Sequence, residues 1–290
     1  MHRIYYFTGT GNSLRVARVV AERMGGAELI SMRCDPKEVP ANGCDAVGFV
    51  YPAYHWTAPD PVVRFVRELD LDPHTYLFAI ATPSLMGGFA CEVVEKLLAE
   101  KGAHLAYGAM VHCVANYALV YPPFPPAKLM IPAMERALNR VADEVARRTI
   151  RPYPKASRLV RRRQSRIMGP YLELQKYADY PFTISDSCVG CGLCSRVCPC
   201  ENIRMEEGRP TFLHHCQNCM ACVTSCPQRA IGYDLSEDVK AAMARGEKVP
   251  IVVRVMGLPK GRKLYRNPFV TSKDLTQDRI IVEGTGRGQG

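Results

Sequence analysis

The chain has 290 residues and a mass of 32.3 kDa, a length that predicts about two domains. A hydrophobic content of 47% and a charged content of 23% are typical of globular proteins and exclude a collagen, a coiled coil and a disordered chain. No apolar run reaches the roughly 18 residues of a membrane-spanning helix, so we expect no transmembrane segment.

The cysteines and the start of the chain indicate a compartment. The first strand-like residues begin at Arg3, with no leader pattern and no cleavage site before them, so we expect a cytoplasmic protein. Disulfides are rare there, and the 13 cysteines therefore point first to metal ligation. Nine of them lie between positions 188 and 226, which marks a second module.

Residues 1–150 alternate between strand-like and helix-like patterns. Runs rich in β-branched and aromatic residues predict strands at residues 3–7, 27–32, 45–50, 76–81 and 105–111. Apolar residues at helical spacing predict helices at residues 13–24, 62–69, 90–101 and 130–148. This alternation favours an α/β fold, a doubly wound parallel sheet of five strands with helices on both faces. Ligands of such folds bind at the carboxyl ends of the strands.

The loop after the first predicted strand is rich in glycine and hydroxyl groups. It reads Thr8, Gly9, Thr10, Gly11, Asn12 and Ser13. Glycines let the backbone approach a ligand, while hydroxyls and helix-start amides donate to a phosphate. The loop lacks the Gly-Lys-Ser/Thr ending of a nucleoside triphosphate site and the three-glycine dinucleotide pattern. It predicts a site for one monophosphate group, and the alternative is a glycine turn in which a serine or asparagine caps the helix.

Residues 7–13 resemble the phosphate-binding loop of flavodoxins, which cradles the phosphate of FMN. The resemblance implies a flavodoxin-like domain with contacts to the flavin ring from later loops. These contacts would come from Tyr54, Trp56, Gly87, Asn116 and Tyr117. Aromatic side chains suit this role because a flat ring system stacks on a π face. For Trp56 the alternative is a core or capping position, and we expect His55 to be a loop residue rather than a catalyst.

Two cysteine runs have the same spacing, and each cysteine of the second follows its counterpart by 28 residues. The runs are Cys188-x2-Cys191-x2-Cys194-x3-Cys198-Pro199 and Cys216-x2-Cys219-x2-Cys222-x3-Cys226-Pro227. This spacing is typical of bacterial two-cluster ferredoxins, in which three cysteines hold one 4Fe-4S cluster and the fourth ligates the other. One cluster would bind Cys188, Cys191, Cys194 and Cys226, and the other Cys216, Cys219, Cys222 and Cys198. Zinc is the alternative, but zinc sites require neither the third cysteine nor the following proline.

The runs imply a small α+β domain of the bacterial ferredoxin type over residues 181–235. Cys200 is a ninth cysteine beside Cys198, and we expect it to be a small packing residue, with a redox or substitute-ligand role as the alternative. The remaining cysteines show no metal spacing and are expected to be buried thiols; they are Cys34, Cys44, Cys91 and Cys113.

A basic segment connects the two modules. Between positions 147 and 166 there are nine Lys or Arg and no acidic residue, which nearly accounts for the net charge of +10. The residues are Arg147, Arg148, Arg151, Lys155, Arg158, Arg161, Arg162, Arg163 and Arg166. The segment is either a solvated linker, a steering surface for an acidic redox protein, or a contact to an anionic membrane or nucleic acid. No nucleic-acid motif supports the last of these, so we expect no nucleic-acid partner.

The order of the modules resembles flavodoxin-ferredoxin fusion proteins. We expect a flavodoxin-like domain at 1–150, a basic connector at 151–180, the ferredoxin domain at 181–235, and a C-terminal extension at 236–290 whose tail from 284 is disordered. A helix at 235–245 and a strand at 250–255 are expected in the extension, and residues 265–275 resemble the family without an evident chemical role. The chain departs from the family at residues 83–86 and 114–115, which would change FMN affinity or potential.

These patterns predict an electron-transfer protein that passes electrons between two 4Fe-4S clusters and FMN. The cofactors carry the chemistry, so no catalytic side chain is assigned and no substrate is named. The absence of a dinucleotide fingerprint argues against direct oxidation of NAD(P)H, so electrons would arrive from another redox protein. The first alternative is a redox or oxygen sensor whose cluster state controls partner binding. The second is a flavodoxin scaffold that binds no cofactor and presents the ferredoxin.

Overall fold

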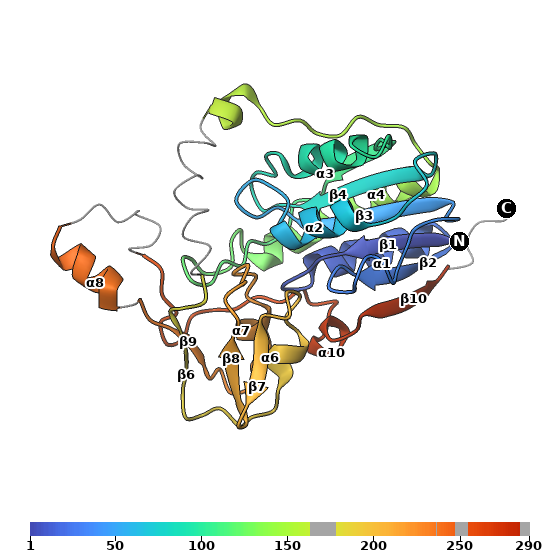
Figure 1. The fold of residues 1–290 in the computed structure, drawn as a ribbon. Helices are drawn as coiled ribbons and strands as arrows, with labels where there is room; N and C mark the ends of the chain where they lie inside the picture. The colour runs from blue at the N-terminus through green and yellow to red at the C-terminus, as the bar shows by residue number, and fades with distance from the viewer. Residues whose placement is uncertain (163–177, 236, 247–254, 285–290) are drawn as a thin grey trace.

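A computed structural model describes residues 1–162, 178–235, 237–246 and 255–284 of the chain. The N-terminal half forms an α/β domain, and a smaller module with short strands lies below it in Figure 1. No helix in the described part of the chain is both long and apolar enough to cross a bilayer.

The central sheet has six strands in the order β10-β2-β1-β3-β4-β5. Its strands are β1 (His2–Tyr6), β2 (Gly26–Ser31), β3 (Ala46–Pro52), β4 (Tyr76–Thr82), β5 (Tyr107–Met110) and β10 (Arg279–Glu283). The first five pair in parallel in the order 2-1-3-4-5, which is the doubly wound flavodoxin-like topology. The predicted five-stranded parallel sheet is therefore present.

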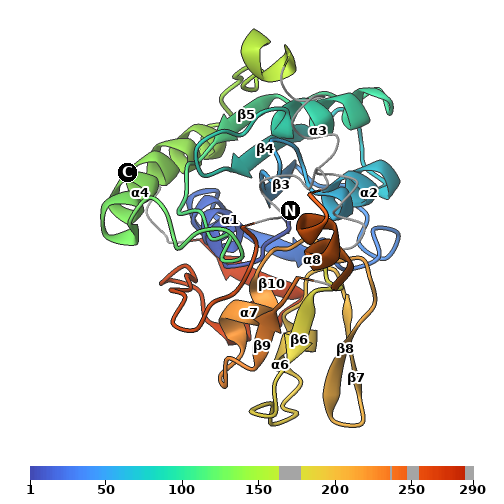
Figure 2. The same cartoon turned by 90° about the vertical axis from the view of Figure 1, so that its left-hand side faces the viewer.

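Two helices cover each face of the sheet (Figure 2). On one face lie α1 (Asn12–Arg23) and α4 (Ala127–Ala146), and on the other α2 (Asp60–Glu68) and α3 (Ala90–Ala99). Alternate strand residues serve the two cores, so that Ile4 packs toward α1 and α4 while Tyr5 packs toward α2 and α3. Helix α4 begins three residues before the predicted position because Pro126 precedes its first turn.

The C-terminal extension returns to the sheet and adds a strand that the sequence did not predict. Strand β10 pairs antiparallel with β2, along the edge seen in Figure 1. Ile280 and Val282 of β10 pack against the core near α1, whereas Ile281 between them is 72% exposed. Two residues of apolar alternation are a weak signal in a sequence, and the pairing partner lies some 250 positions away.

Other predictions for the extension have mixed outcomes. The predicted helix at 235–245 is present as α8 (Glu237–Ala244). A short helix, α10 (Ser272–Leu275), precedes β10 and begins with a capping box between Thr271 and Asp274. The predicted strand at 250–255 falls outside the described residues except for its last position, and the predicted disordered tail falls outside them except for Gly284.

The small module consists of two antiparallel strand pairs and two short helices. The pairs are β6 (Phe182–Ile184) with β9 (Ile231–Tyr233) and β7 (Ile203–Glu206) with β8 (Arg209–Phe212). The helices α6 (Leu193–Arg196) and α7 (Ala221–Ser225) lie within the cysteine runs. Ala118 and Leu119, from the segment after β5, belong to the same apolar core as this module. The predicted small α+β domain is thus packed onto the flavodoxin-like sheet.

The basic connector starts on the other side of the molecule. In Figure 1 the described part of the connector runs past α3, on the side of the sheet away from the small module. Arg151 forms an ion pair with Glu144 at 3.0 Å, and Arg161 forms one with Glu92 at 2.6 Å. The guanidinium of Arg161 also lies over the ring of Phe89, 5.1 Å from its centre. Two of the connector's charges are therefore paired within the chain, and Arg163 and Arg166 lie outside the described residues.

Candidate functional site

Two pockets in the small module collect the cysteines of the two runs. The first pocket is lined by Cys188, Cys191, Cys194 and Cys226. The second is lined by Cys198, Cys216, Cys219 and Cys222, together with Cys200. Each pocket thus contains three cysteines from one run and the proline-linked cysteine of the other, the grouping expected for crossed ligation. The crossed ligation itself stays a prediction.

Backbone amides approach the sulfurs in matching positions of the two runs. The N–H of Asn202 donates to Cys198 Sγ and the N–H of Ala230 donates to Cys226 Sγ, each at 3.3 Å. Both donors lie four residues after the cysteine, so the duplication in sequence is also a duplication in geometry. Amides that point at a sulfur stabilise it as a thiolate, the form that binds iron.

The thiols of the second pocket are the more deeply buried. Burial raises the pKa of Cys219 to about 12 and raises the pKa of Cys216 and Cys222 well above the ordinary value. A thiol in such surroundings ionises only beside positive charge, which iron provides. In the described part of the chain, no three metal-binding side chains converge as they do on a single ion. The thiols instead surround a pocket, and this arrangement fits a cube-shaped cluster.

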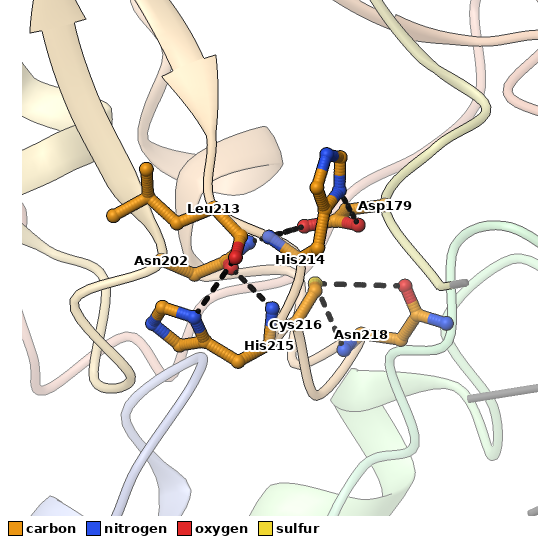
Figure 3. A network of polar contacts seen from close by, with 7 residues as sticks. All are labelled: Asp179, Asn202, Leu213, His214, His215, Cys216 and Asn218. Carbon is orange, nitrogen blue, oxygen red and sulfur yellow. Dashed lines mark hydrogen bonds and ion pairs between the residues drawn. The ribbon is translucent and has the colours of Figure 1, made fainter. Parts of the chain in front are cut away.

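The buried Asp179 connects two chain segments beside the second pocket (Figure 3). Asp179 is 2% exposed and accepts hydrogen bonds from Asn202 Nδ2 at 2.7 Å and from the N–H of His214 at 3.1 Å. Asn202 Oδ1 in turn accepts from the N–H of His215 at 2.7 Å, and the ring of Tyr180 stacks on His214 at 4.0 Å. The network ties the segment after Cys198 to the segment before Cys216. Asp179 lies just before the predicted ferredoxin domain, and no local motif marked it.

A cavity of about 840 Å³ lies at the carboxyl ends of the parallel strands. Its walls are the loops after β1, β3, β4 and β5 and one loop of the small module. Most of the predicted flavin-binding residues line it, namely Thr8, Gly9, Thr10, Asn12, Ser13, Tyr54, Trp56, Asn116 and Tyr117. Both segments that depart from the fusion family line it too, through Ser84, Leu85, Met86, Val114 and Ala115. Gly11 and Gly87 are not among the lining residues.

The loop after β1 has the geometry of a phosphate cradle. Gly11 has a φ of 93°, a left-handed conformation that favours glycine, and its N–H donates to Thr8 Oγ1 at 3.2 Å. Ser13 Oγ lies 2.8 Å from Thr82 Oγ1, so this hydroxyl already has a hydrogen-bond partner within the protein. At Gly9 an added Cβ would collide with the backbone of Cys219. The glycines of the loop are thus required by its turn and by its contact with the small module.

Asn12 has a structural role in this loop. Its Oδ1 accepts from Tyr265 OH at 3.1 Å and from Asn267 Nδ2 at 3.0 Å, and its Nδ2 donates to the carbonyl of Val114 at 3.2 Å. The N–H of Asn267 also donates to the carbonyl of Thr10 at 2.8 Å. Asn267 is 1% exposed and Tyr265 is 6% exposed. The C-terminal extension therefore holds the predicted phosphate loop from behind, a role that the sequence did not reveal because the two segments lie more than 250 positions apart.

The loop after β3 makes a tight turn on the ring side of the cavity. His55 and Trp56 have φ angles of 50° and 66°, which side chains other than glycine rarely adopt. The N–H of Phe89 donates to the carbonyl of Trp56 at 2.7 Å, and an added Cβ at Gly88 would collide with that same carbonyl. Gly88 is thus the glycine that this turn requires, and Gly87, predicted as a contact to the flavin ring, is absent from the cavity lining. Burial lowers the pKa of His55 to about 4, so its ring is neutral near pH 7.

Two buried polar atoms of the cavity wall are available to a ligand. Asn116 Oδ1 and Ser84 Oγ have no hydrogen-bond partner in the described part of the chain. The Asn116 amide is held in place because its Nδ2 donates to the carbonyl of Tyr265 at 2.6 Å. Buried acceptors and donors of this kind normally have partners. Together with the glycine loop after β1, these atoms fit the predicted FMN site, and the placement of the phosphate and of the ring stays a prediction.

The cavity and the second cysteine pocket share a wall. Gln217, Asn218 and Cys219 line both of them. Asn218 spans the wall, since its N–H donates to Cys216 Sγ at 3.3 Å and its Nδ2 lies 3.5 Å from Tyr117 OH. Cofactors in the two sites would therefore be separated by one layer of residues.

Comparison with known protein families identifies one domain of the chain. Residues 181–204 match the model of the 4Fe-4S binding domain family. No curated protein matches the chain significantly.

Solved structures resemble the N-terminal half. The two-electron reduced flavodoxin of Megasphaera elsdenii is 16% identical, with a TM-score of 0.37, over 51% of this chain and 99% of that one. A flavodoxin from Streptococcus pneumonia TIGR4 is also 16% identical, with a TM-score of 0.36, over 51% of this chain and 99% of that one. The rubredoxin oxygen:oxidoreductase of Desulfovibrio gigas is 17% identical, with a TM-score of 0.36, over 50% of this chain and 35% of that one.

The strand order and the family match together confirm the resemblance stated from the motifs. The sheet follows the flavodoxin-like order, and the small module carries a 4Fe-4S binding domain. The chain thus combines a flavodoxin-like fold with a 4Fe-4S binding domain, in the order of modules that the resemblance implied.

Proposed function

We propose that this protein carries electrons between two 4Fe-4S clusters and a bound FMN. The observation that carries the proposal is the wall shared by the second cysteine pocket and the cavity, formed by Gln217, Asn218 and Cys219. Electron transfer requires redox centres that are close together, and a one-layer wall provides this. When bound, the clusters accept single electrons and the flavin accepts two, so the protein would connect one-electron and two-electron couples.

The side chains would bind, orient and shield these groups. Residues 8–13 would hold the phosphate through backbone amides and the Thr10 hydroxyl, with the C-terminal extension keeping the loop in shape. Tyr54 and Trp56 would cover the ring, and Asn116 would offer its buried Oδ1. The eight cysteines of the two runs would hold the clusters in the crossed arrangement. Among the described residues that line the cavity, none carries a formal charge, so the phosphate charge would be balanced by oriented amides alone.

The sensor and the scaffold are the competing functions. A sensor would use cluster state to change partner binding and would not need a cavity that adjoins a cluster pocket. In a scaffold that binds no cofactor, the large cavity and the two buried polar atoms without a hydrogen-bond partner would serve no ligand. The shared wall therefore favours electron transfer. A reducing compartment such as the cytoplasm, and an acidic redox partner, remain part of this proposal.

Rapid mixing of anaerobic holoprotein with a reduced one-electron donor tests the proposal. We expect the visible absorption of the clusters to bleach first and the flavin absorption to follow. If the clusters are reduced while bound flavin stays oxidised, electron transfer between the sites is wrong. If, in addition, affinity for a partner changes with cluster oxidation, the sensor function replaces it.

A further inference from the structure

The two cysteine pockets differ in what surrounds them. The second pocket shares Gln217, Asn218 and Cys219 with the cavity, as described above. None of the residues that line the first pocket lines the cavity or the second pocket, within the described part of the chain. The first pocket lies instead at the surface, where Cys191 is exposed and Val189 is 64% exposed. One pocket thus faces the flavodoxin-like domain and the other faces solvent.

The two short helices of the module connect these pockets. The first cysteine run contains helix α6, and it places Cys194 in the first pocket and Cys198 in the second. The second cysteine run contains helix α7, and it places Cys222 in the second pocket and Cys226 in the first. Since α6 and α7 pack against each other, the two pockets are held at a fixed separation. Electrons can pass from one cluster to the other across this helix pair.

From this asymmetry we infer a fixed order of electron transfer. The cluster of Cys188, Cys191, Cys194 and Cys226 is the port for an external electron carrier. The cluster of Cys216, Cys219, Cys222 and Cys198 is the relay that exchanges electrons with the flavin. The inference rests on the proposed function, and it adds the route and the docking face. The port cysteines would hold the cluster that accepts one electron from the reduced carrier, and the relay cysteines would hold the cluster that passes it to the flavin. Two such electrons and two protons from water would complete flavin reduction.

The rim of the port indicates the kind of carrier that docks there. Arg196 donates to the carbonyl of Cys191 at 3.1 Å, and Arg209 donates to the carbonyls of Ile184 and Ser185 at 3.3 and 3.2 Å. Both arginines thus contact residues that line the first pocket, Cys191 and Ile184, and the exposed Val189 lines the same pocket. Arg209 also forms an ion pair with Asp186 at 3.5 Å. A one-electron carrier with an exposed redox centre inside an acidic surface, such as an acidic ferredoxin, fits this face.

The docking face is tested by two matched substitutions. Val189→Glu places a carboxylate at the centre of the port, and Ile281→Glu places one at a similarly exposed apolar residue on β10, away from the port. Each protein, with iron and flavin content measured first, is mixed anaerobically with reduced acidic ferredoxin or with reduced methyl viologen, and flavin bleaching is followed. We expect Val189→Glu to slow the ferredoxin reaction about tenfold relative to the methyl viologen reaction, because like charges repel the carrier. Ile281→Glu should leave this ratio unchanged.

The order of the clusters is tested by removing one ligand from each pocket. Cys188→Ala should lose flavin reduction by ferredoxin while small methyl viologen still reduces the flavin through the relay. Cys216→Ala should lose flavin reduction by both donors. Equal ferredoxin rates in Cys188→Ala and the parent, or an unchanged ratio in Val189→Glu, would overturn the inference. If a cysteine variant fails to fold, the Val189 and Ile281 pair still decides the port. If neither donor reduces flavin in the fully loaded parent, the proposed function fails, and not merely the order.

Discussion

The two cysteine pockets have the same ligand spacing but different surroundings. The first is open at Cys191, whereas the second lies against Gly9 of the predicted phosphate loop and contributes Cys219 to the wall of the cavity. The duplicated runs keep the same backbone amide contact, from Asn202 in one and Ala230 in the other. The spacing of the cysteines therefore determines which sulfurs meet, while the packing of the module on the sheet determines what each pocket can do.

The largest expected effect concerns the sharing of ligands between the pockets. Cys198→Ala should lose the cluster of the second triplet, and Cys226→Ala should lose that of the first, because each proline-linked cysteine lies in the other run's pocket. EPR or Mössbauer spectra of the two anaerobic variants distinguish the clusters. The Cys198→Ala/Cys200→Ala double variant tests whether Cys200, which lines the same pocket, replaces the missing ligand. Loss of each variant's own triplet cluster would show that ligation is not crossed.

A single negative charge in the loop after β1 should prevent FMN binding. Thr10→Glu should abolish FMN binding and leave the iron content unchanged, because no formally charged side chain among the described lining residues offsets the new carboxylate near the phosphate. Flavin and iron are assayed on one preparation. Thr10→Ser keeps the hydroxyl and should keep the flavin. Full FMN occupancy in Thr10→Glu would mean that this loop does not hold the phosphate.

A smaller effect on FMN affinity is expected from the C-terminal extension, which contacts the loop after β1. Asn267→Ala removes the hydrogen bond to Asn12 Oδ1 and leaves buried polar groups unpaired, which costs about 1–2 kcal/mol. If this energy holds the loop in its binding shape, FMN affinity should fall about tenfold. Flavin fluorescence titration of the apoprotein measures the affinity. Asn139→Ala, on α4 and away from the loop, is the control. An unchanged affinity in Asn267→Ala would assign the C-terminal extension to fold stability only.

The basic connector should have the smallest effect. Reversing Arg161, Arg162 and Arg163 to Glu should slow reduction by acidic ferredoxin by about twofold to threefold at low salt and flatten the salt dependence, since its field is screened over about 8 Å at physiological salt. The effect is limited because Arg161 already pairs with Glu92 at the side of the sheet away from the small module. Stopped-flow rates at several ionic strengths, with cofactor content checked, measure it. A parent-like rate and salt slope would leave the connector a solvated linker.

The features that the sequence predicted are those with local signals. The five parallel strands carry continuous apolar runs, and the eight cysteines carry their spacing, so both could be found without a structure. Strand β10 and the contacts of Tyr265 and Asn267 could not, because they join segments more than 250 positions apart. The role of Gly88 could not be predicted because it depends on the Trp56 carbonyl, which only the fold brings beside it. Asp179 likewise gains its role only from Asn202 and His214, which the fold brings to it.

The most direct test is the cofactor content of anaerobically purified protein. Iron, acid-labile sulfide and flavin are quantified on one sample whose visible spectrum is recorded before and after reduction. The account predicts about eight iron atoms and about one FMN per chain, from two four-iron clusters and one flavin site. A chain that binds about four iron atoms, or binds its clusters but takes up no FMN when FMN is supplied in excess, would contradict it.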